Sequence, residues 1–200
     1  MRNQHHNTRA AESGFSLVET LVAITILLIV ITGPMTISTS SARSTSFASE
    51  QVVAFFLAQE GLELVQKARD DEFIKMFAGG VSDPWGEVMD DATGATYYQC
   101  FTTTGCGLEL DPSIDDVLDS PVNCSSGNRC RLYYKASADR SKYTYISTGA
   151  EETPYTRVIT MELISADVAR VESKVFWRSG NQRSAQEVIV ETFLYDIYGN

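Results

Sequence analysis

The chain of 200 residues and 22.1 kDa is long enough for one compact domain with a real core and an additional segment. Hydrophobic residues make up 44% and charged residues 21%, which excludes a multi-span membrane protein and a disordered chain. The formal net charge of -10 disfavours nucleic acid as a direct partner, because phosphate binding needs a basic face. Both histidines, His5 and His6, lie at the very start, so an enzyme would lack the usual general base and the commonest metal ligand. We therefore expect no enzymatic activity and no cofactor.

An apolar run over residues 15–31 follows a polar, basic N-terminus. As a helix it would reach about 26 Å, slightly less than the ~30 Å hydrocarbon core of a bilayer, and Met35 and Ile37 can extend it. Arg2 and Arg9 precede it with a single acidic counter-charge, so the positive-inside bias predicts a cytoplasmic N-terminus. The rest of the sequence has no second apolar run of this length. These features predict a single-pass protein of the inner, cytoplasmic membrane whose C-terminal body lies outside.

Glu19 is the one charge inside this run. A carboxylate near the middle of a bilayer costs about 2.5–3.5 kcal/mol on insertion scales, so it needs a partner. A secretory signal peptide, cut after the small residues Ser40, Ser41 and Ala42, leaves this glutamate unexplained. A plain membrane anchor accounts for the length of the run but not for its charge.

The residues around Glu19 favour a third interpretation. Residues 14–19 read GFSLVE at the start of the apolar run, and this segment resembles the N-terminus of type IV pilins and type II secretion pseudopilins. In that family a membrane aspartyl peptidase, the prepilin peptidase, cuts on the cytoplasmic side after the glycine and then methylates the new amino group. The resemblance implies cleavage between Gly14 and Phe15, with Phe15 as the N-methylated first residue. It also gives Glu19 the position of the family's glutamate, which pairs with the N-terminal amine of a neighbouring subunit.

The resemblance implies a structural subunit of a surface filament, which leaves the membrane and polymerises through its N-terminal helix. The implied partners are the prepilin peptidase, an inner-membrane platform protein, a cytoplasmic assembly ATPase, other pilin subunits and, before assembly, membrane lipid. A major pilin, a minor pilin and a secretion pseudopilin share this N-terminal segment, so all three stay open. Outside the family, the alternatives are a membrane-anchored enzyme, a membrane-anchored binding module and a secreted binding module that starts at Arg43.

The apolar run leads into a second helical segment, and Gly33 and Pro34 lie between the two. Proline removes one backbone donor and clashes with the preceding turn, so we expect a kink or a break there, or a helix stop followed by a linker. From Ser49 the spacing of apolar residues predicts an amphipathic helix that ends near the glycines at 79–80. Its buried stripe is expected to consist of Val52, Phe55, Gln59, Leu62, Val65 and Arg69.

The C-terminal part of the chain is predicted to be rich in strands. Turn residues predict a loop over 80–96, and short strands are expected at 97–103, 131–136 and 143–147. Alternating apolar and charged residues over 171–177 and 188–194 predict an antiparallel hairpin with one polar face. The expected fold class is α+β, with a long bent N-terminal helix packed on a C-terminal antiparallel sheet, as in pilins. The expected parts are a cleaved leader (1–14), a membrane or filament-core helix (15–34), the second half of the long helix (35–78) and an extracellular head (79–200).

Four cysteines lie close together in this head. Their spacing differs from the Cys-x2-Cys of zinc sites, and an exported domain favours two disulfides over a metal site. We expect first the local pairing 100–106 with 124–130, and second the nested pairing 100–130 with 106–124. The cysteines are Cys100, Cys106, Cys124 and Cys130. An acidic loop is a candidate for calcium, although its spacing fits no known calcium loop: Asp83, Glu87, Asp90 and Asp91.

Overall fold

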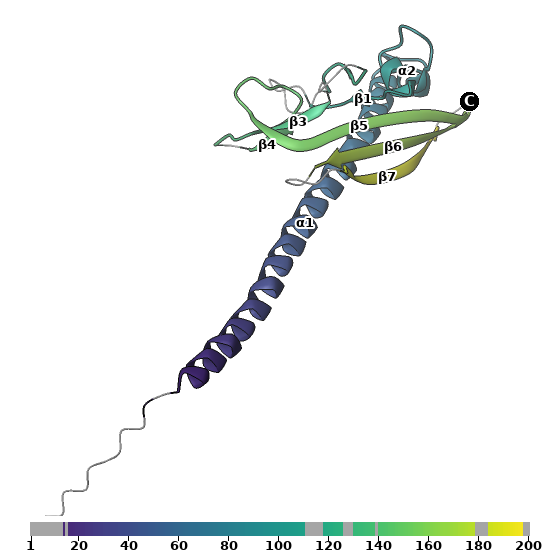
Figure 1. Cartoon of the computed structure of the whole chain (residues 1–200). Coiled ribbons are helices and arrows are strands. Elements are labelled where there is room, and N and C mark those ends of the chain that lie inside the picture. Colours follow the sequence, from purple (N-terminus) through teal and green to yellow (C-terminus); the bar gives the residue numbers. More distant parts are fainter. Residues whose placement is uncertain are drawn as a thin grey trace, which may run out of the picture. The chain divides into compact units, whose positions relative to one another are not determined.

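The computed structural model describes residues 14, 16–110, 118–125, 130–138, 140–178 and 184–197. The chain divides into two compact units, Met1–Ser46 and Phe47–Asn200, and the boundary falls inside the long helix α1 (Leu17–Phe77). Figure 1 shows α1 and the strands of the second unit. We call the unit Phe47–Asn200 the head.

Helix α1 is continuous through Pro34. A helix stop or break at Gly33 and Pro34 is therefore wrong, and the kink that the sequence also allows there stays a prediction. A proline inside a helix removes a single backbone hydrogen bond, which the neighbouring turns can tolerate. The threonines nearby do not compete with the helix, because their hydroxyls donate to carbonyls one turn earlier: Thr32 to Ile29 at 3.2 Å and Thr36 to Gly33 at 2.8 Å.

Helix α1 ends where the glycines predict. Gly79 has a positive φ of 78°, a conformation that residues with a Cβ rarely adopt. The Gly79 N–H donates to the Met76 carbonyl at 2.9 Å, and the Gly80 N–H donates to the Lys75 carbonyl at 2.9 Å. These two bonds form a Schellman motif, which satisfies the last carbonyls of the helix.

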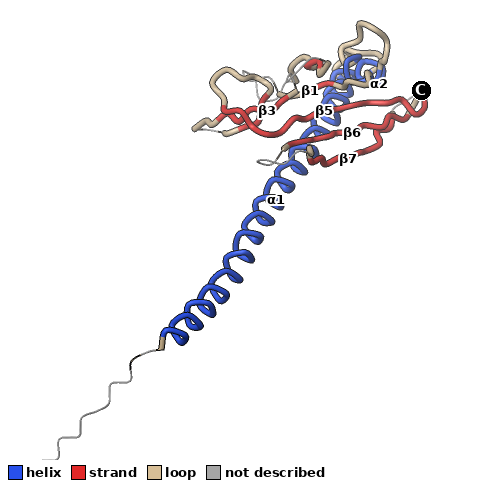
Figure 2. The backbone as a smooth tube through the Cα atoms, in the orientation of Figure 1, coloured by secondary structure: helices blue, strands red, loops and turns tan. Residues whose placement is uncertain are grey.

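The described strands of the head form one antiparallel sheet around β5. Strands β3 and β1 pair with successive parts of the same edge of β5. The other edge of β5 pairs with β6, which in turn pairs with β7. Figure 2 shows β5, β6 and β7 as neighbouring strands. The strands are β1 (Cys106–Gly107), β2 (Val122–Asn123), β3 (Arg131–Lys135), β4 (Lys142–Thr144), β5 (Glu151–Ser165), β6 (Val168–Trp177) and β7 (Gln186–Tyr195). The α+β architecture expected from the sequence is confirmed.

The predicted C-terminal hairpin is also confirmed. Strands β6 and β7 pair antiparallel over their full length, from Val168 opposite Tyr195 to Trp177 opposite Gln186. Burial alternates along β6, so every second residue from Ala169 to Trp177 is buried while the residues between them are only partly covered. Alternation of this kind places one face of a sheet in the core and leaves the other in water.

The predicted buried stripe of the second half of α1 is wrong by about one position. Val52 and Phe55 are 54% and 42% exposed, whereas Leu62 and Val65 are buried as expected. Much of the contact with the sheet comes from small residues, because they let the helix backbone approach the strands closely. A Cβ added at Gly61 would overlap the Ser173 hydroxyl. The buried residues of α1 are Ala54, Leu57, Ala58, Gly61, Leu62, Leu64, Val65, Ala68 and Phe73.

Gly61→Ala is expected to destabilise the head by about 1–3 kcal/mol through overpacking, more than the gain in helix propensity of up to ~1 kcal/mol. The added Cβ would lie 3.2 Å from Ser173 Cβ and 3.3 Å from Arg157 Cδ, in addition to the overlap with the hydroxyl. The Ser173 hydroxyl is buried and has no hydrogen-bond partner, so Ser173→Ala alone should change stability little. Denaturant unfolding of the full chain should show that the double variant recovers part of the loss. A double variant no more stable than Gly61→Ala alone would contradict this packing.

Two segments of the head differ from the prediction. Residues 80–96 contain the short helix α2 (Pro84–Met89), in which Asp83 is the N-cap and its carboxylate accepts from the Gly86 N–H at 2.9 Å. The strand expected at 97–103 is instead a 3-10 turn, Tyr98–Phe101. Helix α2 is fixed by a distant partner, since Trp85 Nε1 donates to the Ala166 carbonyl at 2.8 Å.

Candidate functional site

The segment that contains the predicted processing motif leads directly into α1. Gly14 and Ser16 precede the helix, and Phe15 lies outside the described residues. The Thr20 N–H donates to the Ser16 carbonyl at 3.1 Å, so helical hydrogen bonding begins at Ser16. Glu19 lies in the first turn of α1 and is exposed. An acid at this end of a helix is favourable, because the macrodipole is positive there.

The first half of α1 presents an exposed apolar surface. Each described residue before Phe47 is exposed, including Leu17 at 79% and Ile29 at 72%. Within the part of the chain that the structure describes, α1 is long and apolar enough to cross a membrane, as judged by length and composition. A surface of this kind is unfavourable in water and calls for lipid or other apolar helices.

Polar groups within this surface are satisfied inside the helix. The hydroxyls of Thr20 and Thr25 donate to the carbonyls of Leu17 and Val22 at 2.9 and 2.8 Å. A threonine bonded in this way brings no unpaired donor into an apolar environment. Glu19 is the one charged side chain of the sequence from 17 to 42, so its carboxylate is the group that still needs a partner.

The comparison with protein families identifies this segment. Residues 9–33 match the prokaryotic N-terminal methylation motif. That motif is the class III signal peptide of type IV pilins and pseudopilins, and it supports a pilin-like substrate of prepilin peptidase. No curated protein and no solved structure matches the chain. The apolar N-terminal helix is consistent with membrane anchoring.

The four cysteines form two disulfides in the head, Cys100 with Cys106 and Cys124 with Cys130. This is the local pairing rather than the nested one. Cys100 and Cys106 are fully buried in the core beside α1, and Cys130 is 2% exposed. Each bridge closes a short loop. The first holds the turn that leads into β1, and the second joins the residue after β2 to the residue before β3.

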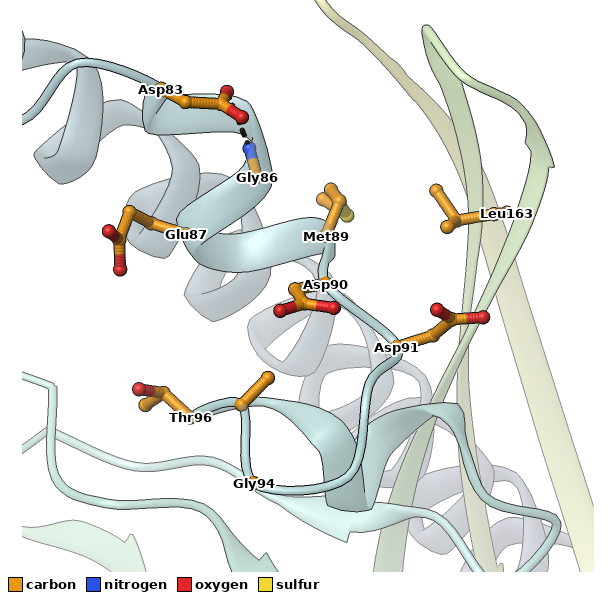
Figure 3. A pocket seen from close by; sticks show the side chains of 10 residues that line it. Asp83, Gly86, Glu87, Met89, Asp90, Asp91, Gly94, Thr96 and Leu163 are labelled. Atoms are coloured by element: carbon orange, nitrogen blue, oxygen red, sulfur yellow. Dashed lines mark hydrogen bonds between the residues drawn. The ribbon is translucent and has the colours of Figure 1, made fainter.

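The acidic loop lines a cavity of about 560 Å³, shown in Figure 3. Two of its four carboxylates already cap backbone groups: Asp83 accepts from Gly86, and Asp90 accepts from the Ala92 N–H at 2.8 Å. Among the described residues, no group of three or more acidic, histidine or cysteine side chains is placed to hold a metal ion. The structure therefore gives the calcium candidate no support.

A buried arginine is the main feature of the head that the sequence analysis missed. Arg157 on β5 is 1% exposed and lies between the sheet and α1. Its guanidinium donates to the Leu57 carbonyl at 3.2 Å and to the Glu60 carboxylate at 2.7 Å, both on α1. It also donates to the Leu108 carbonyl at 2.8 Å and to the Tyr145 hydroxyl at 2.9 Å. One side chain thus joins α1, the segment after β1 and the segment after β4.

The guanidinium of Arg157 stays charged in this environment. Burial by itself lowers the pKa of Arg157, but Tyr145 and Glu60 outweigh burial and raise it. Burial raises the pKa of the Tyr145 hydroxyl, although Arg157 opposes that shift, so the tyrosine stays neutral. The alternation of residues 155–161 could have revealed this arginine, because it places Arg157 on the same face as the buried Tyr155 and Ile159.

Proposed function

We propose that the chain is a structural subunit of a type IV pilus-like surface filament. The prepilin peptidase cuts after Gly14, and the mature chain, which begins at N-methylated Phe15, assembles through the first half of α1. The observation that carries this proposal is the exposed apolar first half of α1 with a single carboxylate, Glu19, in its first turn, inside the motif matched at residues 9–33. The domain organisation that we propose is a leader (1–14), a core helix (15–34), a second helical half (35–78) and a head (79–200).

The pairing of Glu19 with an N-terminal amine gives the assembly its register. Cleavage after Gly14 creates a positive amine at the start of a helix, where the macrodipole disfavours a cation. Glu19 lies four residues on, about 6 Å along the helix axis. When helices leave the bilayer and pack together, a lone buried charge is costly and a paired one is tolerated. The amine of an arriving subunit that contacts Glu19 of its neighbour therefore favours one axial position.

Proteolytic processing is, in this mechanism, the switch that permits assembly. An uncut leader would block the amine and add Arg2 and Arg9 at the seam between the apolar helices. Before assembly, lipid covers the apolar half of α1, with the N-terminus in the cytoplasm and the head outside. After assembly, other subunits cover it within an extracellular filament. The proposed partners are the prepilin peptidase, a platform protein of the inner membrane, a cytoplasmic assembly ATPase and further pilin subunits.

The mature N-terminus tests this proposal directly. Intact-mass analysis and N-terminal sequencing of the surface-exposed protein are expected to show a chain that begins at N-methylated Phe15. Gly14→Val should leave the leader attached, because in the family that this segment resembles the peptidase cuts after a glycine. A chain that begins at Arg43 would instead indicate a secreted binding module, and one that keeps residue 1 would indicate a membrane-anchored module.

A further inference from the structure

Two surfaces of the head carry opposite charge. The segment 80–96, which contains α2, has four acidic residues and no basic one. The segment 131–144, which contains β3 and β4, has four basic residues and one acidic residue, Asp139, which lies outside the described residues. Figure 1 shows α2 and the β3–β4 hairpin at opposite ends of the head. We call the four carboxylates beside α2 the acidic surface, and residues 131–144 the basic hairpin.

The acidic surface is hollow and carries charge of one sign. Its carboxylates are exposed and line the cavity of about 560 Å³ seen in Figure 3, and none of the residues that line this cavity is basic. Within the part of the head that the structure describes, Glu87 and Asp91 form no ion pair. Like charges this close repel one another, so a cationic partner would lower the energy of the whole surface. The carboxylates are Asp83, Glu87, Asp90 and Asp91.

The basic hairpin has the complementary arrangement. Lys135 on β3 pairs directly with Lys142 on β4, so both side chains project from the same face of the strand pair. Arg140 lies in the connection between the two strands and is exposed. Two like charges directly opposite one another destabilise a strand pair. A carboxylate that approaches this face from outside would reduce that repulsion.

A second copy of the chain fits both surfaces at once. Two acidic surfaces repel each other, and so do two basic hairpins, which disfavours any contact between identical surfaces. The contact of a hairpin with an acidic surface brings opposite charges together. Because the two surfaces lie at opposite ends of the head, one chain cannot pair its own hairpin with its own acidic surface. Lysine and arginine carry their charge at the end of a long stem, which suits a hollow partner.

We propose that the basic hairpin of one copy docks on the acidic surface of the next, with Lys135 and Lys142 against Glu87 and Asp91. The contact is heterologous, so each copy uses both surfaces and the contact can repeat from copy to copy. Single exposed ion pairs are weak, but anchoring in one membrane raises the effective concentration of the heads, and several pairs then act together. The contact goes beyond the proposed filament function, because it depends on the charges of the head and not on the packing of α1.

Carbodiimide cross-linking of the full chain in lipid vesicles tests the contact. The reagent joins a carboxylate to an amine without a spacer and with loss of water, so only touching groups react. Isotopically heavy and light chains are mixed before reconstitution. Peptide mass spectrometry should then find heavy–light links between lysines of the basic hairpin and carboxylates of the acidic surface. Links within one chain between Lys174 and Glu187, an ion pair of 2.9 Å, serve as the internal standard.

Salt and occupancy give the expected pattern of this cross-link. About 0.5 M NaCl should reduce the heavy–light links at least threefold relative to the standard, because salt screens exposed charges. Absence of heavy–light links while the standard forms would overturn the proposal. A small cation that fills the hollow in place of a second copy would protect Glu87 and Asp91 from the reagent without any heavy–light link, and would overturn it too.

Introduced thiols show whether the contact joins two different surfaces. All four native cysteines are in disulfides, so Ser137→Cys in the basic hairpin and Thr96→Cys beside the acidic surface each add one free thiol. A flexible bismaleimide should give at least fivefold more dimer with a mixture of the two variants than with either variant alone. Equal dimer from one variant alone would indicate contact between identical surfaces and would overturn the proposal.

Exchanging the charges separates specific docking from unfolding. In the Ser137→Cys chain, Lys135→Glu with Lys142→Glu should reduce the mixed dimer at least fivefold. Adding Glu87→Lys with Asp91→Lys to the Thr96→Cys chain should restore it, because the charges are again opposite. Loss without restoration would overturn the proposal.

The matched control keeps the change in net charge but leaves the hairpin intact. Lys75→Glu with Lys174→Glu, placed in the Ser137→Cys chain, changes the charge by the same amount on exposed side chains outside the basic hairpin. This chain should keep the mixed dimer. An equal loss would show that net charge alone governs the association, against the proposal.

The vesicles separate this contact from filament assembly, because they contain neither the prepilin peptidase nor an assembly ATPase. Heavy–light links in vesicles support the docking of the heads even if the chain proves to form no filament. Their absence overturns the docking even if the cells assemble filaments that begin at Phe15.

Discussion

Replacing Arg157 with leucine is expected to lower the free energy of unfolding of the head by about 3–5 kcal/mol. The substitution removes four hydrogen bonds and leaves the buried carbonyls of Leu57 and Leu108 without this donor. The Leu57 carbonyl keeps its hydrogen bond within α1, but the Leu108 carbonyl and the Tyr145 hydroxyl each lose a buried partner. An unsatisfied buried polar group costs about 1–3 kcal/mol, so these two groups account for most of the loss. Glu60 is 46% exposed and regains water, which is why its lost ion pair adds little.

Fluorescence of Trp85 and Trp177 measures this effect, because both are buried in the head and are the sole tryptophans of the sequence. Denaturant unfolding of the full chain should show a lower midpoint for Arg157→Leu, with Arg157→Lys in between. The matched control is Arg170→Leu on β6, whose ion pair with Glu162 spans 2.5 Å at a side chain that is 41% exposed. That control should change stability little, because a solvent-exposed ion pair contributes little to folding. Equal losses for Arg157→Leu and Arg170→Leu would show that burial is not the cause.

The parts of the fold that the sequence predicts correctly depend on local patterns. The alternation of apolar and charged residues over 171–177 and 188–194 predicts the two faces of the C-terminal hairpin. A strand has this two-residue period whichever strand it pairs with, so the local sequence is sufficient. The glycine pair after Phe77 likewise predicts the end of α1, because the hydrogen bonds that end the helix are local. The processing motif is also local, since residue order and spacing around Gly14 and Glu19 are sufficient to recognise it.

The errors arise where distant residues decide the structure. The predicted buried stripe included Phe55 because this side chain is large and apolar. The face of α1 that packs on the sheet is instead determined by the close approach of Gly61 to Ser173. Asp83 and Pro84 are turn residues by composition, yet α2 begins with them because Trp85 reaches the distant Ala166 carbonyl.

The arginine was missed for a related reason. A charged residue in the middle of a strand is usually assigned to the solvent face, whereas Arg157 lies inside because α1, Leu108 and Tyr145 supply its partners. These partners are 12 to 100 residues away in the sequence. Local alternation indicates the correct face, but only the assembled head shows that the buried charge is satisfied.

Replacing Glu19 with leucine is expected to reduce the yield of ordered surface filaments at least tenfold. The substitution removes the carboxylate that, in the proposed mechanism, pairs with the N-terminal amine of a neighbour. The apolar surface of α1 remains and even increases, so the helices can still associate. They lose the charge pair that penalises misregistered packing, and so we expect irregular association in place of filaments. Electron microscopy and the amount of protein released by shearing measure the yield.

Two further variants identify the charge as the cause. Glu19→Gln keeps the shape and the hydrogen-bonding capacity of the side chain but removes its charge, and should fail like the leucine variant. Thr20→Leu is the matched control, because it removes an adjacent exposed polar group whose hydroxyl bonds only within the helix. Cleavage between Gly14 and Phe15 should continue in all three variants, since the bond lies outside the substituted positions, and intact mass would verify it. Normal numbers of regular filaments with Glu19→Leu would show that the acid does not set the register, and the assembly mechanism would be wrong.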